Sequence, residues 1–415
     1  MLRSRSPFII IVLILLSFAC SFGTEAFSEK TMPTAAEAQI ISKAKCGDDV
    51  CDGPENQTNC PADCNQSTAL ITAQITATSQ AQAEAIKTPQ AAATQTDTES
   101  IQPLNFFYAI HTHANGDYLP YTSPGMKEID PMVAENMIAA IEGIQAVLDR
   151  HQVKGTWELV YGTAKGLCEI GGEQNLLLEL QNDGHEIATH AHQVGDTPLV
   201  TEILRDDCGI EPDTASAFIL YADKAEQGKE QQAVSDAIQL GVDLGLHTGT
   251  VNFSPGGDKN PFTSICNQQI GVGNDMWQQT GNLLFPWRPD YLNNNICADN
   301  HAGEMVFVDH VSIEWTIAPN GKKVDQLGQM DFMRLQKQFD AALNYMLINR
   351  PERTTAWGFV THITEYSPGE GTEAPPNPES LAALDAFLSY VEEQADQGLV
   401  IFATASQIAG KVRSK

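Results

Sequence analysis

The sequence predicts an α/β fold in which parallel strands form a barrel surrounded by helices. From residue 104 onward, short apolar runs typical of buried strands alternate with segments of helical hydrophobic spacing. This alternation is typical of βαβ units, whose strands pair in parallel. The region extends over about 300 residues, a length that favours a barrel over a small sheet.

The expected elements follow one another in a regular order. Strands are expected at 105–110, 155–162, 185–192, 304–317, 356–363 and 399–405. Helices are expected at 131–151, 175–184, 331–349 and 379–398. The stretch around 245–300 is expected to contain loop insertions.

The first residues are typical of a secretory signal peptide, which we place at 1–26. Arg3 and Arg5 precede the apolar run 8–19, which is too short for a comfortable membrane span. Cys20 could alternatively carry a lipid anchor. The chain is therefore expected to be exported, to the periplasm, the cell surface or the medium, with no transmembrane span in the mature protein.

A small Cys-rich module and a flexible linker are expected to precede the barrel, which we place at 104–415. Four cysteines lie within 46–64, a polar stretch that only disulfides or a metal could order. Its acidic residues leave calcium binding open as an alternative to a plain disulfide module. Residues 66–103 are rich in Ala, Thr and Gln, a composition that buries too little apolar surface to fold.

Charge and cysteine content narrow the possible partners. The formal net charge of −29 argues against nucleic acid or an anionic membrane as a partner. Without Cys20, an even number of cysteines remains, which suits an oxidising compartment. Four of them are expected to form disulfides that brace the barrel's long connections: Cys168, Cys208, Cys266 and Cys297.

Two motifs of the same form end two of the expected strands. HTHANGD (111–117) and HAHQVGD (190–196) both read His-x-His-x-x-Gly-Asp. Alternate residues of a strand share a face, and the carboxyl ends of barrel strands carry the reactive groups. Imidazole is the commonest metal ligand in proteins, and zinc suits such a cluster. The expected ligands of a divalent metal, with zinc favoured, are His111, His113, His190 and His192.

Each motif also supplies a carboxylate. Asp117 and Asp196 could orient a ligating histidine or act as a base. Glycine and aspartate are both common in turns, so the repeated Gly-Asp could arise by coincidence.

Five segments follow one another along 104–410: QVKGTWELVYGTAKG (152–166), LQNDGHEIATHAHQ (180–193), FPWRPDYL (285–292), WGFVTHITEY (357–366) and GLVIFATASQIAGKV (398–412). Together they resemble the polysaccharide deacetylase superfamily, also called the NodB-homology or carbohydrate esterase family 4 fold. The resemblance implies a distorted (β/α)7 barrel. It also implies metal-assisted hydrolysis of an N- or O-acetyl group on a carbohydrate, such as a cell-wall polysaccharide.

The resemblance implies roles for particular residues. His362 would donate a proton to the leaving group, Asp117 would be the catalytic base, and Arg288 would position the acid or the substrate. Glu365, in HITE, could make a further polar contact. The sequence departs from the family where the first strand should end in two adjacent aspartates, because His111 and His113 stand there instead.

Two alternatives remain open at this point. A metal-dependent amidohydrolase or phosphoesterase barrel would use further histidines, for which His247 and His310 are candidates. A non-catalytic surface protein that binds glycan would account for the missing pair of aspartates.

Overall fold

The computed structural model describes residues 102–112, 131–170, 175–191, 196–216, 226, 228–251, 282–312, 327–366 and 376–415. The chain divides into two compact units, Met1–Thr98 and Glu99–Lys415, and the described residues all belong to the second unit. The expected signal peptide, the expected Cys-rich module and nearly all of the expected linker lie outside them. Among the described helices, none is both long enough and apolar enough to cross a membrane.

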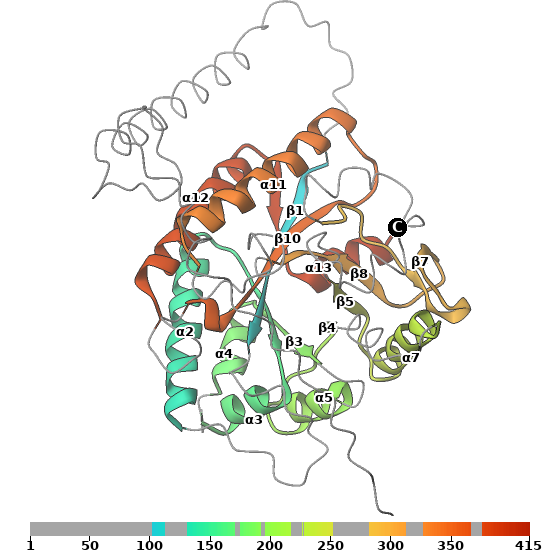
Figure 1. Ribbon diagram of the computed structural model, residues 1–415, viewed down its shortest axis with the longest axis horizontal. Helices are drawn as coiled ribbons and strands as arrows, with labels where there is room; N and C mark the ends of the chain where they lie inside the picture. The colour runs from blue at the N-terminus through green and yellow to red at the C-terminus, as the bar shows by residue number, and fades with distance from the viewer. Residues whose placement is uncertain are drawn as a thin grey trace, which may run out of the picture. The chain divides into compact units, whose positions relative to one another are not determined.

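Strands and helices alternate along the described part of the chain (Figure 1). The strands are β1 (Leu104–Thr112), β2 (Thr156–Leu159), β3 (Glu186–His190), β4 (Thr214–Ser216), β5 (Thr248–Val251), β6 (Pro289–Asp290), β7 (Asn295–Asp299), β8 (Val306–Asp309), β9 (Val311–Ser312), β10 (Ala356–His362) and β11 (Val400–Phe402). The α-helices are α2 (Pro131–Arg150), α3 (Tyr161–Ile170), α4 (Leu176–Asn182), α5 (Asp196–Asp206), α7 (Glu230–Asp243), α11 (Gln329–Asn349), α12 (Pro378–Asp396) and α13 (Ala405–Arg413). Short 3-10 helices follow β6 and β10, at Tyr291–Asn293 and Ile363–Tyr366.

The parallel strands form a closed ring. The order of pairing is β8, β5, β4, β3, β2, β1, β10 and β9. The segment 306–312 contains both ends of this order, because β8 pairs with β5 and β9 pairs with β10. Counting that segment once, the described strands occupy seven positions around the ring. The expected (β/α)7 barrel is confirmed.

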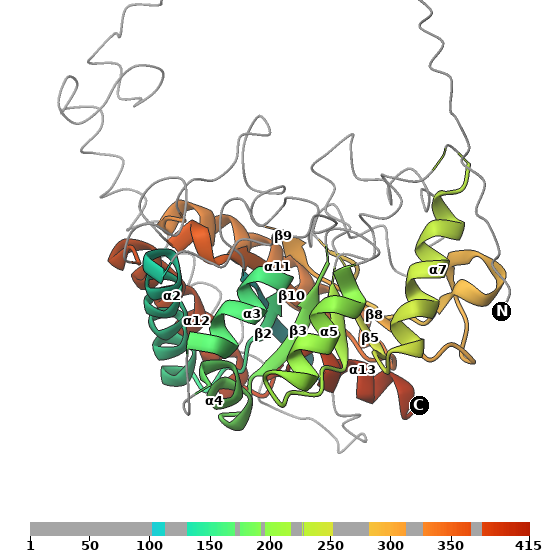
Figure 2. The same ribbon diagram turned by 90° about the horizontal axis from the view of Figure 1, so that it is seen from below.

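The barrel is distorted beside β1. The first residues of β1, Leu104–Phe106, pair with β11. The last residues of β1, Ala109–Thr112, pair with β2. The β11 strand therefore enters beside β1 near the amino-terminal end of the barrel, where β2 has not yet begun. Helix α13 follows at once and lies at the same end, because Arg413 donates to the carbonyl oxygen of His247, just before β5 (Figure 2).

Side chains alternate between the interior of the barrel and the surrounding helices. Phe107 and Ala109 of β1 belong to an interior cluster with Val306, Val308 and small residues of α13. Phe106 and Tyr108 point the other way, into the larger core beneath α2, α11 and α12. His111 continues the inward-facing set of β1, because strand residues two apart share a face.

Local signals account for the helix ends that the sequence predicted. Asn175 caps the start of α4, since its side chain accepts hydrogen bonds from the backbone N–H groups of Leu177 and Leu178. Gly184 follows the helix with φ +92°, a left-handed conformation that favours glycine. The chain then turns directly into β3.

The expected elements differ from the structure in several places. The run 304–317 predicted one strand, but its described part is divided into β8 and β9, and α5, β4 and α7 were not expected. The run 155–162 predicted one strand, but β2 ends at Leu159 and α3 starts at Tyr161. The stretch 245–300, expected as loops, contains β5 and the β6–β7 hairpin. The sequence pattern hid β5 because its residues, Thr-Gly-Thr-Val, carry little apolar surface.

Disulfides brace the connections between strands. Cys168 of α3 is bonded to Cys208, just after α5, with 5.4 Å between the two Cα atoms. Cys297 of β7 is also disulfide-bonded.

Candidate metal centre

Three neighbouring strands bring polar side chains to the same level of the barrel. His111 of β1 lies opposite His362 of β10 on one side and Glu158 of β2 on the other. Residues in register on parallel strands point to the same face, so all three side chains face the interior. They lie at the carboxyl ends of their strands, where barrel enzymes carry their active sites.

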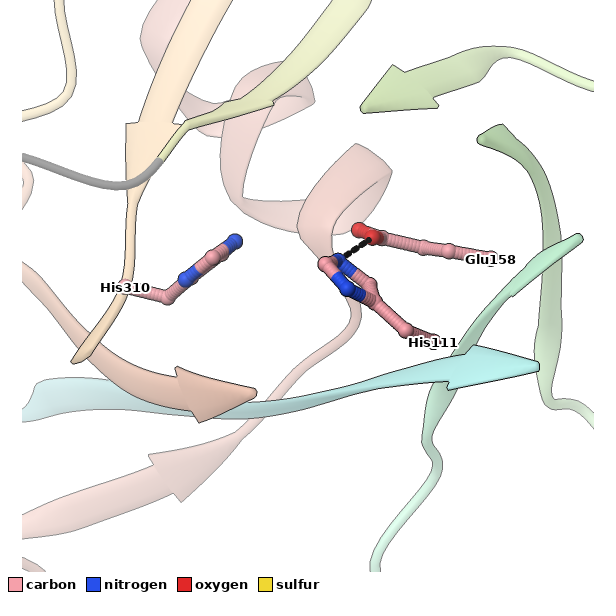
Figure 3. A group of neighbouring side chains, drawn as sticks. All are labelled: His111, Glu158 and His310. Carbon is pink, nitrogen blue, oxygen red and sulfur yellow. Dashed lines mark ion pairs between the residues drawn. The ribbon is translucent and has the colours of Figure 1, made fainter. Parts of the chain in front are cut away.

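His310 reaches the cluster from the opposite wall. It is the single residue between β8 and β9, where the chain leaves β5 and begins to pair with β10. Its backbone N–H donates to the carbonyl oxygen of Val251 at 3.0 Å. The side chain is buried and extends toward the carboxylate of Glu158 (Figure 3).

His190 adds a further imidazole beside His111. The centroids of the two rings are 4.0 Å apart. Nδ1 of His190 lies 2.5 Å from the hydroxyl oxygen of Ser216, its register partner on β4. One histidine from each predicted His-x-His pair therefore lies in the same cluster.

The two carboxylate oxygens of Glu158 have different surroundings. Oε2 lies 2.7 Å from Nε2 of His111 and 4.0 Å from Nδ1 of His190. Oε1 accepts a hydrogen bond from the hydroxyl of Thr250 at 2.5 Å. The side chain has no solvent exposure. Thr250 thus fixes a buried carboxylate whose other oxygen faces imidazole nitrogens.

Burial changes the ionisation of this cluster. Desolvation lowers the pKa of His310 to about 4, and nearby Glu158 only partly opposes that shift. Desolvation, together with the neighbouring His362, also holds the pKa of His111 well below its usual value. Burial raises the pKa of Glu158, partly offset by His310. At neutral pH the two imidazoles are therefore neutral, which is the form that binds metal ions.

The donor set fits a divalent cation. One ligand atom each from His111, Glu158 and His310 lies within 4.8 Å of the others. Nδ1 of His310 is buried and has no hydrogen-bond partner among the described residues. In the same part of the chain, Glu158 forms no ion pair with Lys or Arg, and a buried carboxylate without a positive partner is costly. Two nitrogens and one oxygen are ligands typical of zinc.

A line of contacts leads away from His111. Its Nδ1 lies 3.2 Å from Nε2 of His362. Nδ1 of His362 lies 3.3 Å from one carboxylate oxygen of Glu365, and the backbone N–H of His362 donates to the other at 2.8 Å. Glu365 is almost fully buried, at 1% exposure. The line therefore runs from a buried carboxylate through two imidazoles to Glu158.

The structure describes two of the four predicted metal ligands. His111 and His190 lie together as expected, whereas His113, His192 and the predicted base Asp117 lie outside the described residues. Glu158 belongs to neither His-x-His motif and was not among the predicted site residues. The available signal was a glutamate between Trp157 and Leu159 in an expected strand, where a buried acid requires a partner.

Of the two histidines kept for the alternative barrel, only His310 joins the cluster. His247 lies just before β5, at the other end of the barrel, where its Nδ1 contacts Asp213 at 3.0 Å.

The structure also describes two further predicted residues, Arg288 and Asp196. The guanidinium of Arg288 donates to the carbonyl oxygens of His301 and Val412. Trp287 pairs antiparallel with Phe307, which places Arg288 toward the start of β8 and His310 beyond its end. Asp196 is the buried first residue of α5, where a helix N-terminus favours a carboxylate.

No protein family model and no curated protein match this chain. Several solved structures are similar to it. A protein from Mycobacterium smegmatis assigned as a polysaccharide deacetylase is 15% identical, with 78% of this chain and 95% of that chain covered and a TM-score of 0.43. The Puue allantoinase is 11% identical over 76% and 92% of the two chains, with a TM-score of 0.46. A protein from Pseudomonas aeruginosa PAO1 assigned as a polysaccharide deacetylase is 12% identical over 75% and 91%, with a TM-score of 0.39.

Proposed function

We propose that this chain is a metal-dependent hydrolase that removes N- or O-acetyl groups from an extracytoplasmic carbohydrate. The observation that carries the proposal is the cluster of half-buried His111 with buried Glu158 and His310 at the carboxyl ends of the barrel strands. Two neutral imidazoles and a carboxylate without a Lys or Arg partner among the described residues form a site that a divalent cation would complete.

The residues of the cluster would hold and orient the cation, with zinc favoured. His111, Glu158 and His310 supply ligand atoms, and Thr250 fixes the carboxylate. When bound, such an ion polarises an acyl oxygen and lowers the pKa of water. His190 lies beside His111 as a further candidate ligand.

The two His-x-His motifs supply the remaining candidates. His113 and His192 lie two residues beyond His111 and His190, and we propose them as additional ligands. Asp117 follows four residues after His113 in the sequence and is proposed as the base that accepts a proton from water.

The substrate class follows from the sequence. The ordered segments that resemble polysaccharide deacetylases support an acetylated glycan or a cell-wall polysaccharide as substrate. The signal-like residues 1–26 support export, with Cys20 as a possible lipid anchor, and the net charge of −29 disfavours nucleic acid.

Metal analysis and acetate release test the proposal together. The full chain is purified, its metal content is measured, and acetate release is followed with acetylated chito-oligosaccharides, acetylated xylan and peptidoglycan. Bound zinc together with metal-dependent acetate release supports the function. A chain that binds no divalent metal, or that binds it and releases no acetate from any of these glycans, contradicts it.

The position of His310 favours one second candidate. A metal-dependent amidohydrolase or phosphoesterase would use a late-strand histidine, and His310 lies in the cluster. Hydrolysis of cyclic amides or phosphate esters by the metal-loaded chain, without acetate release from glycans, would favour that candidate.

A further inference from the structure

His362 and Glu365 form a hydrogen-bonded chain behind the candidate ligand His111. Each contact joins a single pair of atoms: Glu365 Oε1 to His362 Nδ1 at 3.3 Å, and His362 Nε2 to His111 Nδ1 at 3.2 Å. The register of β1 and β10 fixes this approach, because His111 and His362 are opposite each other on neighbouring strands. The backbone N–H of His362 also donates to Glu365, which locks the carboxylate in place.

The position of one proton decides how the hydrogen bonds between Glu365, His362 and His111 act on His111. A carboxylate accepts hydrogen bonds, so His362 donates from Nδ1 to Glu365. A neutral His362 then carries a lone pair on Nε2, and the contact with His111 requires a proton on Nδ1 of His111. The tautomer of His111 that follows has its lone pair on Nε2, the nitrogen that faces Glu158 at 2.7 Å. That is the form in which His111 ligates a cation through Nε2.

We infer that His362 and Glu365 are positioning residues that act through His111, holding its tautomer and ring orientation for metal binding. The inference rests on the proposed metal centre and deepens it. Partners that accept the second N–H of a ligating histidine raise its basicity and fix its ring, and their loss typically costs about 10–100-fold in metal affinity.

This role differs from the proton donor that the sequence resemblance implies for His362. A donor to a leaving group must direct an N–H toward the substrate. In the structure, Nδ1 of His362 faces Glu365 and Nε2 faces His111. Both ring nitrogens of His362 are therefore directed at protein side chains, Glu365 and His111.

A pair of substitutions at one position separates the two roles. His362→Leu fills the space but cannot accept the N–H of His111. His362→Gln offers an amide oxygen near the former Nε2, yet it cannot donate a proton as an acid. Zinc affinity of the full chain is measured by competition with a chromophoric chelator, and the absorption spectrum of the cobalt-substituted protein reports the ligand environment.

We expect His362→Leu to weaken zinc binding by about 10–100-fold and to alter the cobalt spectrum. His362→Gln should stay within about threefold of the wild type in affinity, since it still accepts the hydrogen bond from His111. Wild-type zinc affinity and an unchanged cobalt spectrum in His362→Leu would overturn the inference.

Glu365→Gln is a second variant of nearly equal shape. Its amide nitrogen can donate to Nδ1 of His362, which reverses the direction of both hydrogen bonds and places the lone pair of His111 on Nδ1. Zinc binding should weaken by about 3–10-fold, toward the lower end of effects typical of such partners. If His362→Leu does not fold, unchanged affinity and an unchanged cobalt spectrum in Glu365→Gln would overturn the inference.

His247→Gln is the matched control. His247 also pairs with a carboxylate, Asp213, but lies at the other end of the barrel. Its zinc affinity should equal that of the wild type. A wild-type chain that binds no zinc contradicts the proposed function itself, whereas a zinc-binding chain insensitive to His362→Leu contradicts only the role of His362 and Glu365.

Discussion

The two ends of the barrel interior each hold a glutamate that burial affects, yet their partners differ. Glu158 lies at the carboxyl end, on β2, and Glu186 lies at the amino end, on β3. Glu186 Oε2 accepts hydrogen bonds from the Thr156 hydroxyl at 2.9 Å and from the backbone N–H of Ser406 at 3.2 Å. Its Oε1 accepts from the Thr214 hydroxyl.

The comparison separates a structural carboxylate from a candidate ligand. Burial raises the pKa of both side chains, but neutral donors satisfy both oxygens of Glu186, including an amide at the start of α13. The hydroxyl of Thr250 donates to Oε1 of Glu158, whereas its Oε2 faces two histidines. Burial alone does not mark a functional acid, whereas the chemistry of its partners does.

The largest expected effect is a loss of hydrolysis in Glu158→Gln that is absent from the parallel variant Glu186→Gln. Glu158→Gln should lower metal-dependent hydrolysis by at least about 1,000-fold, equivalent to about 4 kcal/mol in the barrier, because an amide is a poor substitute for an anionic ligand. Glu186→Gln should leave both metal content and hydrolysis unchanged. Steady-state kinetics and metal analysis of both variants check this, and equal losses in the two would break the comparison.

Removing the metal should lower the free energy of unfolding of the wild type and leave that of Glu158→Gln unchanged. At free zinc about 100 times above Kd, binding adds about 2.7 kcal/mol to the free energy of unfolding. Chemical denaturation with and without a chelator measures the difference. A chelator effect of the same size in Glu158→Gln would show that the zinc binds elsewhere.

Truncating the structural acid should affect stability alone. Glu186→Ala leaves the hydroxyls of Thr156 and Thr214 and the N–H of Ser406 without their acceptor, at a cost of about 2 kcal/mol in the free energy of unfolding. Zinc affinity should stay at the wild-type value. Denaturant titrations and chelator competition on the same preparation provide the two readouts, and weakened zinc binding would contradict the division between the ends.

The smallest expected effect is a pH dependence set at the amino end, by His185. Burial, together with Lys154, lowers the pKa of His185 to about 4, and its Nδ1 accepts from the N–H of Gly155 and the indole N–H of Trp157. The unfolded chain binds a proton near pH 6.5, so stability is full above that pH and is lost as pH falls toward 4.

At pH 5.5 the loss should be about 1 kcal/mol. The difference in unfolding free energy between pH 7.5 and 5.5 should shrink by that amount in His185→Gln, which has no ionisable group. An identical pH dependence in the variant would remove His185 as the cause.

The sequence predicted the barrel but not its complete interior. Long strands such as β1 and β10 are strongly apolar, whereas β4 (Thr-Ala-Ser) and β5 direct hydroxyls inward and resemble loops by composition. The same cause concealed half of the site. His111 and His190 belong to a repeated motif, but Glu158 and His310 are single polar residues that only the register and the break between β8 and β9 bring to His111.

The pairing of β11 with the start of β1 has a consequence for biosynthesis. Residues 400–402 complete the wall beside residues 104–106, and Lys411 donates to the side chain of Asn105 at 2.6 Å. These contacts span nearly the whole barrel sequence, and contacts between distant residues slow folding. The ribosome must therefore release almost all of this region before β11 can pair with the start of β1.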